Sequence, residues 1–171
     1  MARRMNKTGD SQSGDGVGLA KVPARLGEIG LDNFAPYLMN RIMGRYNASV
    51  REEMAKLGLT TPQMRSLSVL SVIDGILIRE LAVYAVVEQS TLSRAIDTLD
   101  RDGLIRRETD AGDSRATRVF LTSAGRQTND RLWPLLSASY EQMFDGISQE
   151  DRRAFVGTLQ RMLGNVRKHE F

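Results

Sequence analysis

Apolar residues recur every three or four positions over one long stretch near each end of the chain. The first stretch runs from Phe34 to Leu57, and Gly58 follows it. This spacing predicts one apolar face of a long helix, which the glycine ends. The second stretch begins after Ser148 and Asp151, a pair typical of a capping box. Its apolar positions predict another one-faced helix: Phe155, Leu159, Met162 and Val166.

The middle of the chain is divided into shorter elements by turn residues. Thr60 or Thr61 can cap a helix that has Pro62 in its first turn, and we expect Gly75 to end it. Ile76 and Leu77 can add a short strand after that glycine. Residues 79–87 then predict a short helix whose buried side chains are Leu81, Ala82 and Tyr84.

A helix that starts at residue 88 carries an unusual group of side chains in its first turns. When Leu92, Ile96 and Leu99 face the core, the exposed side starts with Ser90, Thr91, Ser93 and Arg94. Ser and Thr are mediocre formers of helix interiors, and Glu88 or Gln89 stands where a capping Ser or Asp would serve better. Capping therefore leaves the group partly unexplained, and a plain solvated face is the simpler alternative.

A β-hairpin and another long helix follow. Residues 104–109 and 116–121 are prone to form strands, and they flank a turn that contains Gly112. Thr122 can cap a helix that runs to about Phe144, with Pro134 inside it as an expected kink. The pattern therefore predicts a mainly α fold with a small β-hairpin.

The composition excludes several kinds of chemistry. The 171 residues include no cysteine, so disulfides, thiol catalysis and thiolate metal sites are excluded. The single histidine, His169, cannot supply a zinc site by itself, and no glycine-rich phosphate loop is present. We expect no metal, no cofactor and no enzyme. No apolar run approaches the roughly 18 residues of a membrane span, and no signal peptide is recognisable, so a cytoplasmic protein is expected.

The net charge alone does not indicate a partner. The chain carries a charge of +3, but residues 1–28 hold five basic and three acidic residues, which is most of the surplus. Residues 1–18 are rich in Gly, Ser and polar residues and are expected to form a disordered tail. Over residues 88–118, six arginines face seven acids. A DNA-binding function must therefore rest on where the charges lie.

The positions of the polar and charged residues favour a DNA-binding function. The helices at 79–87 and from 88 onward are typical of a helix-turn-helix, whose second helix enters the major groove with its first residues against base edges. Ser and Thr can donate or accept hydrogen bonds there, and Arg94 can bind guanine in a bidentate manner. The hairpin would form a wing, with Arg115 at its tip reaching a minor groove and Asp113 orienting it. A winged-helix module that binds a protein instead of DNA is the alternative.

Two stretches carry a resemblance to a known family. The segment DAGDSRATRVFLTSAG contains an Asp-x-Arg pair, Asp113 and Arg115, followed by Leu121-Thr122 and Gly125, and STLSRAIDTLDRDGLIRR precedes it. In this order and spacing, residues 32–167 resemble the MarR (multiple antibiotic resistance regulator) family of winged-helix transcription regulators.

The resemblance implies a winged helix-turn-helix with a helical dimerisation region. Residues 61–121 would form the DNA-binding lobe, while 19–60 and 122–171 would build the dimerisation region. It also implies a homodimer that binds an inverted-repeat operator in double-stranded DNA and acts as a repressor, released by a small, often aromatic, effector. The DNA-contacting positions would be Ser90, Thr91, Ser93, Arg94 and Arg115, with Asp113 in support.

The effector and its pocket are not defined by the sequence. Tyr37, Arg41 and Tyr46 can line such a pocket or belong to the core or dimer interface. The chain departs from the family at Glu88, where a capping Ser or Asp is usual, and at Pro134. The absence of cysteine excludes the family's cysteine-sensing branch.

Overall fold

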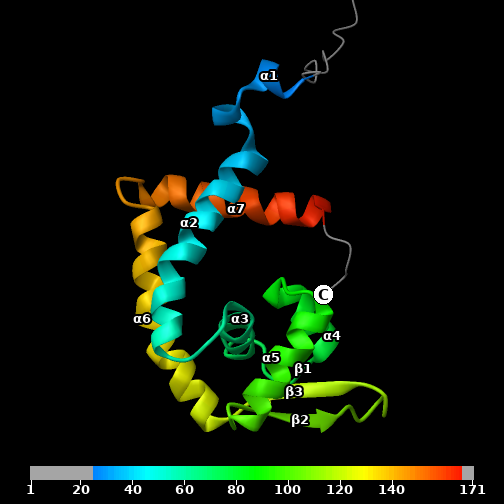
Figure 1. The fold of residues 1–171 in the computed structure, drawn as a ribbon. Coiled ribbons are helices and arrows are strands. Elements are labelled where there is room, and N and C mark those ends of the chain that lie inside the picture. Colours follow the sequence, from blue (N-terminus) through cyan, green and yellow to red (C-terminus); the bar gives the residue numbers. More distant parts are fainter. Residues whose placement is uncertain (1–24, 167–171) are drawn as a thin grey trace, which may run out of the picture. The chain divides into compact units, whose positions relative to one another are not determined.

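A computed structural model describes residues 25–166 (Figure 1). The tail predicted at 1–18 and His169 lie outside the described residues. The described residues fall into two compact units, 25–40 and 41–166. Within the described part of the first, a short helix α1 (Leu26–Ile29), which the sequence pattern did not predict, precedes a single 3-10 turn at Leu31–Asn33. The long helix α2 (Ala35–Lys56) starts in this unit and continues into the next.

The second unit contains the other elements that the sequence predicts. They are α3 (Thr61–Leu70), β1 (Ile76–Leu77), α4 (Ile78–Ala85), α5 (Gln89–Arg101), β2 (Ile105–Thr109), β3 (Thr117–Leu121), α6 (Ser123–Met143) and α7 (Gln149–Val166). The expected mainly helical fold with a small β wing is confirmed. Two predicted caps are present: Thr122 Oγ1 accepts the amide of Gly125 at 3.0 Å, and Ser148 Oγ accepts that of Asp151 at 3.1 Å. Helix α6 continues through Pro134.

Three antiparallel strands form the sheet, in the order β1-β3-β2. The register aligns Ile76 with Val119 and Ile105 with Leu121. Gly75 precedes β1 with φ 73°, and a Cβ added there would lie 2.6 Å from the Phe120 ring. Glycine is therefore required at this position both by its left-handed backbone and by the neighbouring ring.

Helices α3, α4 and α5 pack on one another, and all three also contact the sheet strands (Figure 1). Their apolar faces meet in a single core. Its most deeply buried residues come from seven elements: Met54, Leu67, Leu70, Leu81, Leu92, Ile96, Leu99, Ile105, Val119 and Leu132. This core fixes the orientation of α5 and thereby selects the face that α5 presents outward.

Two local predictions are wrong. Helix α3 ends at Leu70 and not at Gly75, because the Ser71 hydroxyl bonds to the Ser68 carbonyl at 2.7 Å and the chain then turns toward β1. Tyr84 is exposed, since the buried face of α4 is centred on Leu81 and Ala85, and Tyr84 lies at the edge of that face. No helix within residues 25–166 is both long and apolar enough to span a membrane.

Candidate DNA-binding surface

Helix α5 presents a polar face to solvent because its apolar face is buried in the core. Leu92, Ile96 and Leu99 are at most 1 % exposed, and they fix the rotation of the helix about its axis. The four predicted contact residues of this helix all lie on the exposed side: Ser90, Thr91, Ser93 and Arg94. The N-cap residue, Glu88, makes no side-chain capping bond, as its identity predicts.

The acids on α5 are paired with an arginine from the sheet. Arg107 on β2 places Nη2 2.6 Å from Asp97 Oδ1 and Nε 3.2 Å from Asp100 Oδ2. The Nε atom is buried, and its contact with Asp100 lacks hydrogen-bond geometry, so this second contact is electrostatic. Exposed ion pairs contribute little stability, but these two neutralise charge on the outward face of α5.

The same pairing extends from the end of α5 through the wing. Arg101 pairs with Asp102 at 3.4 Å, and further pairs join Arg106 to Glu108 and Arg118 to Asp110. By contrast, the side chains of Arg94 and Arg115 have no hydrogen-bond or ion-pair partner within residues 25–166. Local ion pairs thus offset the excess of acidic residues over 88–118. Arg94 and Arg115, two of the predicted contact residues, keep unpaired positive charges.

The tip of the wing is ordered by two aspartates. Asp110 Oδ1 accepts the amides of Gly112 and Asp113, both at 2.9 Å, while its other oxygen pairs with Arg118. The hydrogen bond from Arg118, followed by that from Gly112, lowers the pKa of the Asp110 carboxyl. Arg118 also donates to the Gly75 carbonyl at 2.7 Å, so it connects the wing tip to the start of β1.

Asp113 acts on the backbone of the wing. Its Oδ1 accepts the Arg115 amide at 3.0 Å, and its carbonyl accepts the Ala116 amide at 2.9 Å. The sequence-based expectation was that Asp113 orients the Arg115 side chain. The structure instead shows a turn that fixes where the Arg115 backbone lies, and from there the exposed side chain leaves the wing.

A shallow hollow brings the wing and the start of α5 together. Its lining residues include Arg79 on α4, Gln89 on α5, and Asp113 and Arg115 on the wing. Sequence reasoning missed Arg79 and Gln89, because neither differs from an ordinary solvated helix residue. The structure therefore brings Asp113 and Arg115 close to the N-terminal end of α5, and Ser90, Thr91, Ser93 and Arg94 follow directly along that helix.

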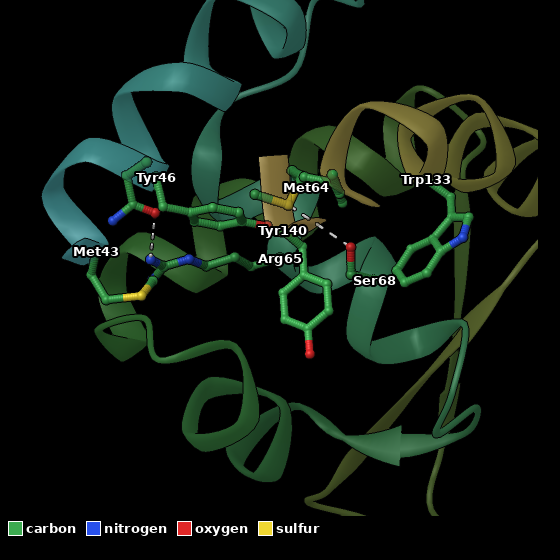
Figure 2. Close-up of a pocket in the computed structure, with 9 residues that line it drawn as sticks. Met43, Tyr46, Met64, Arg65, Ser68, Trp133 and Tyr140 are labelled. Carbon is green, nitrogen blue, oxygen red and sulfur yellow. Dashed lines mark hydrogen bonds between the residues drawn. The ribbon is translucent and has the colours of Figure 1, made fainter. Parts of the chain in front are cut away.

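A separate pocket of about 350 Å³ lies among α2, α3 and α6 (Figure 2). Its lining is mostly apolar or aromatic: Met43, Tyr46, Asn47, Met64, Arg65, Ser68, Trp133, Leu136 and Tyr140. Burial raises the pKa of Tyr46, and the nearby Arg65 charge partly opposes that shift. Of the three residues proposed for a pocket from sequence, Tyr46 lines this one. No group of acidic or histidine residues within 25–166 could hold a metal ion.

Comparison with known proteins places these features in a family. A model described as MarR family matches residues 57–116. A crystal structure of a MarR-family transcriptional regulator from Silicibacter pomeroyi is 58% identical, with a TM-score of 0.82; the match covers 86% of this chain and 99% of that one.

More distant relatives are consistent with the same family. The HTH-type transcriptional repressor IacR of Pseudomonas putida is 28% identical over 136 residues, which are 80% of this chain and 79% of IacR. BpsR of Bordetella bronchiseptica, whose DNA binding is regulated by 6-hydroxynicotinic acid, shares the fold at 23% identity, with a TM-score of 0.66 over 75% of this chain and 97% of that one. The Silicibacter pomeroyi protein and IacR are transcriptional regulators, as expected from the sequence, and not enzymes. Because it is 58% identical to a solved family member along nearly that protein's whole length, the chain belongs to the MarR family of transcriptional regulators.

Proposed function

We propose that the protein is a homodimeric repressor that binds an inverted-repeat operator and is released by a small aromatic ligand. The observation that carries the DNA contact is the charge arrangement on the α5–wing surface. The acids Asp97 and Asp100 are paired with Arg107, while Arg94 and Arg115 remain available for bases or phosphates. In the dimer, two α5 helices would lie about 34–36 Å apart, one helical turn of DNA.

The dimer is supported by apolar surface near the C-terminus. Helix α7 exposes four large apolar side chains: Phe155, Met162, Leu163 and Val166. A second copy of the chain would cover them, which is the arrangement we propose for residues 19–60 and 122–171, with 61–121 as the DNA-binding lobe. Contiguous exposed apolar surface of this kind is typical of association sites.

Repression and ligand release rest on separate support. The relative IacR is a repressor, which favours repression over activation for this protein. The aromatic lining of the pocket among α2, α3 and α6 suits a planar ring of similar size. BpsR contributes only its fold to this argument, so the proposed ligand class stands on the pocket itself.

The proposal is tested by selecting operator DNA from a random double-stranded pool and measuring its binding by fluorescence anisotropy at several salt concentrations. We expect an inverted repeat and a steep loss of affinity with salt. Arg94→Ala should weaken binding to the selected site by about 1–3 kcal/mol if Arg94 makes a bidentate base contact. Arg51→Ala removes the same charge from exposed α2 and should change affinity little. An absence of binding even at low salt would refute the proposal and favour the protein-interaction alternative.

A further inference from the structure

The hollow between the wing and the start of α5 has a volume of about 390 Å³ and is enclosed on three sides. One wall is the start of α4, which contributes Arg79, and another is Gln89, the first residue of α5. The wing forms the third wall with Asp113, Arg115 and Thr117. Two helix starts and the wing therefore face one space on the candidate DNA-binding surface.

Arg79 has no partner within the described part of the chain. Its side chain is exposed, and it forms no hydrogen bond or ion pair within residues 25–166. The acid next to it, Glu80, turns back to the start of α4, where its Oε2 accepts the Leu77 amide at 3.2 Å. The guanidinium of Arg79 is therefore available for an anion from outside the chain.

The charges that line the hollow favour such an anion. Arg79 and Arg115 contribute two positive charges, and Asp113 contributes one negative charge. Oδ1 of Asp113 accepts the Arg115 amide at 3.0 Å, so this oxygen is already bound to the backbone of the wing. The lining of the hollow thus keeps a net positive charge.

The geometry of duplex DNA indicates which anion this would be. In the proposed complex, α5 lies in a major groove and the tip of the wing reaches the adjacent minor groove. One sugar-phosphate strand separates two adjacent grooves of a duplex. Because the hollow lies between α5 and the wing, that strand would run across it. The anion would then be a backbone phosphate and not the edge of a base.

We infer that the hollow is a seat for the DNA backbone, and that Arg79 binds a phosphate of the strand between the two grooves. The guanidinium fork matches phosphate oxygens in geometry and charge. A phosphate contact carries no sequence information, but it fixes the register and orientation of the protein on the duplex. Arg79 would thus differ in role from Arg94, for which a base contact is proposed. The inference rests on the proposed function, because it takes α5 and the wing as the DNA-binding elements.

Salt dependence tests the contact in the full-length protein on the selected operator. Arg79→Ala should weaken binding about tenfold or more, as expected for a lost hydrogen bond to a charged group. The slope of log affinity against log salt concentration should fall by about two, one phosphate for each half of the dimer. Arg79→Lys keeps the charge and should keep the slope. Arg51→Ala, on exposed α2, is the matched control and should keep both affinity and slope.

A second measurement identifies the phosphate itself. Operator duplexes in which one phosphate at a time is replaced by a neutral methylphosphonate lose one charge while every base is unchanged. One replacement, in the strand between the bases read by α5 and the minor groove at the wing, should weaken binding of the wild-type protein and leave binding of Arg79→Ala unchanged. Replacements at other phosphates should affect both proteins equally. Circular dichroism and thermal unfolding verify that each variant is folded.

The outcomes separate this inference from the proposed function. If the wild-type protein binds its operator and Arg79→Ala keeps the wild-type slope, or loses affinity to an extent that depends on the bases, the inference is overturned and the proposed function stands. If the wild-type protein selects no operator, the proposed function fails. Binding to unselected duplex DNA at low salt then decides the inference: a reduced slope in Arg79→Ala supports the contact, whereas an equal slope or no binding overturns it.

Discussion

Helix α5 buries four of its 13 residues, whereas α7, with 18 residues and its own apolar face, buries none. Leu99 on α5 has an exposed fraction of 0 %, and Leu163 on α7 has 64 %. Both helices have the same kind of spacing in the sequence. The difference is that α3, α4 and the sheet cover α5, while residues 25–166 supply no such cover for α7.

The contrast separates two uses of an amphipathic face. In α5 the apolar face orients a polar surface, so the helix is a means of presenting Ser90, Thr91, Ser93 and Arg94. In α7 the apolar face is itself the exposed surface, which supports its proposed role in association. Substitutions on α5 should therefore affect unfolding of the single chain, and substitutions on α7 should affect assembly.

The largest expected effect is on the core of α5. Leu99→Ala should lower the free energy of unfolding by about 2–5 kcal/mol, because it leaves a cavity in a fully packed region. Leu163→Ala should cost much less, and only at protein concentrations at which the dimer forms. Urea unfolding at two protein concentrations distinguishes the two effects. A similar loss for both variants at low concentration would show that α7 is packed within the chain after all.

The next largest effect is expected on dimer assembly through α7. Leu163→Glu should raise the dimer dissociation constant by about 30-fold or more, the effect typical of a central interface residue. Analytical ultracentrifugation measures the change directly. Val72→Glu is the control, since Val72 is 83 % exposed in the turn after α3 and has no part in the proposed interface. A Leu163→Glu protein that remains dimeric would place the interface elsewhere.

Elements could be predicted from the sequence wherever local chemistry decides them. Thr122 and Ser148 start their helices as caps, and the spacing of Leu92, Ile96 and Leu99 gives the buried face of α5. These features depend on residues at most seven positions apart. For the same reason the sequence placed Ser90 and Arg94 on one exposed face.

Features that depend on distant partners could not be predicted. Asp74 accepts the Leu121 amide at 2.7 Å across 47 positions, and Arg65 reaches Val86 across 21. Periodicity indicates that a face is exposed or buried, but it does not identify the residue opposite. The pairing of Arg107 with acids of α5, which changes the electrostatics of the candidate site, was invisible for that reason.

A smaller effect is expected where α7 joins α6. Arg152 donates to both carboxylate oxygens of Glu141, at 2.7 and 2.8 Å, and its guanidinium lies over the rings of Tyr140 and Phe144. Arg152→Ala should therefore accelerate hydrogen exchange in the first turns of α7 while leaving α5 unchanged. Arg153→Ala, an exposed neighbour, is the matched control. Unchanged exchange in α7 would mean that other contacts anchor this helix.

The smallest expected effect concerns acid and the wing, the other part of the surface that α5 presents. The pKa of Asp110 is lowered, mainly by its hydrogen bond from Arg118 and then by that from Gly112, below an ordinary value of 3.8. A lowered pKa means that the carboxylate stabilises the folded wing at pH values above 3.8, and that this support is lost as the pH falls through the lowered pKa. Because its main partner, the Arg118 side chain, is 42 % exposed to solvent, the loss should be small and local.

This loss should appear as faster exchange of the Gly112, Asp113 and Ala116 amides in acid, after correction for intrinsic exchange rates. In Asp110→Asn the same amides should exchange faster already at neutral pH, and the acid-dependent change should be much reduced. Exchange in α7 should be equal in both proteins, since its nearest shifted carboxyl, Glu141, is intact. If wild type and Asp110→Asn respond equally to acid, then another carboxyl organises the tip from which Arg115 extends.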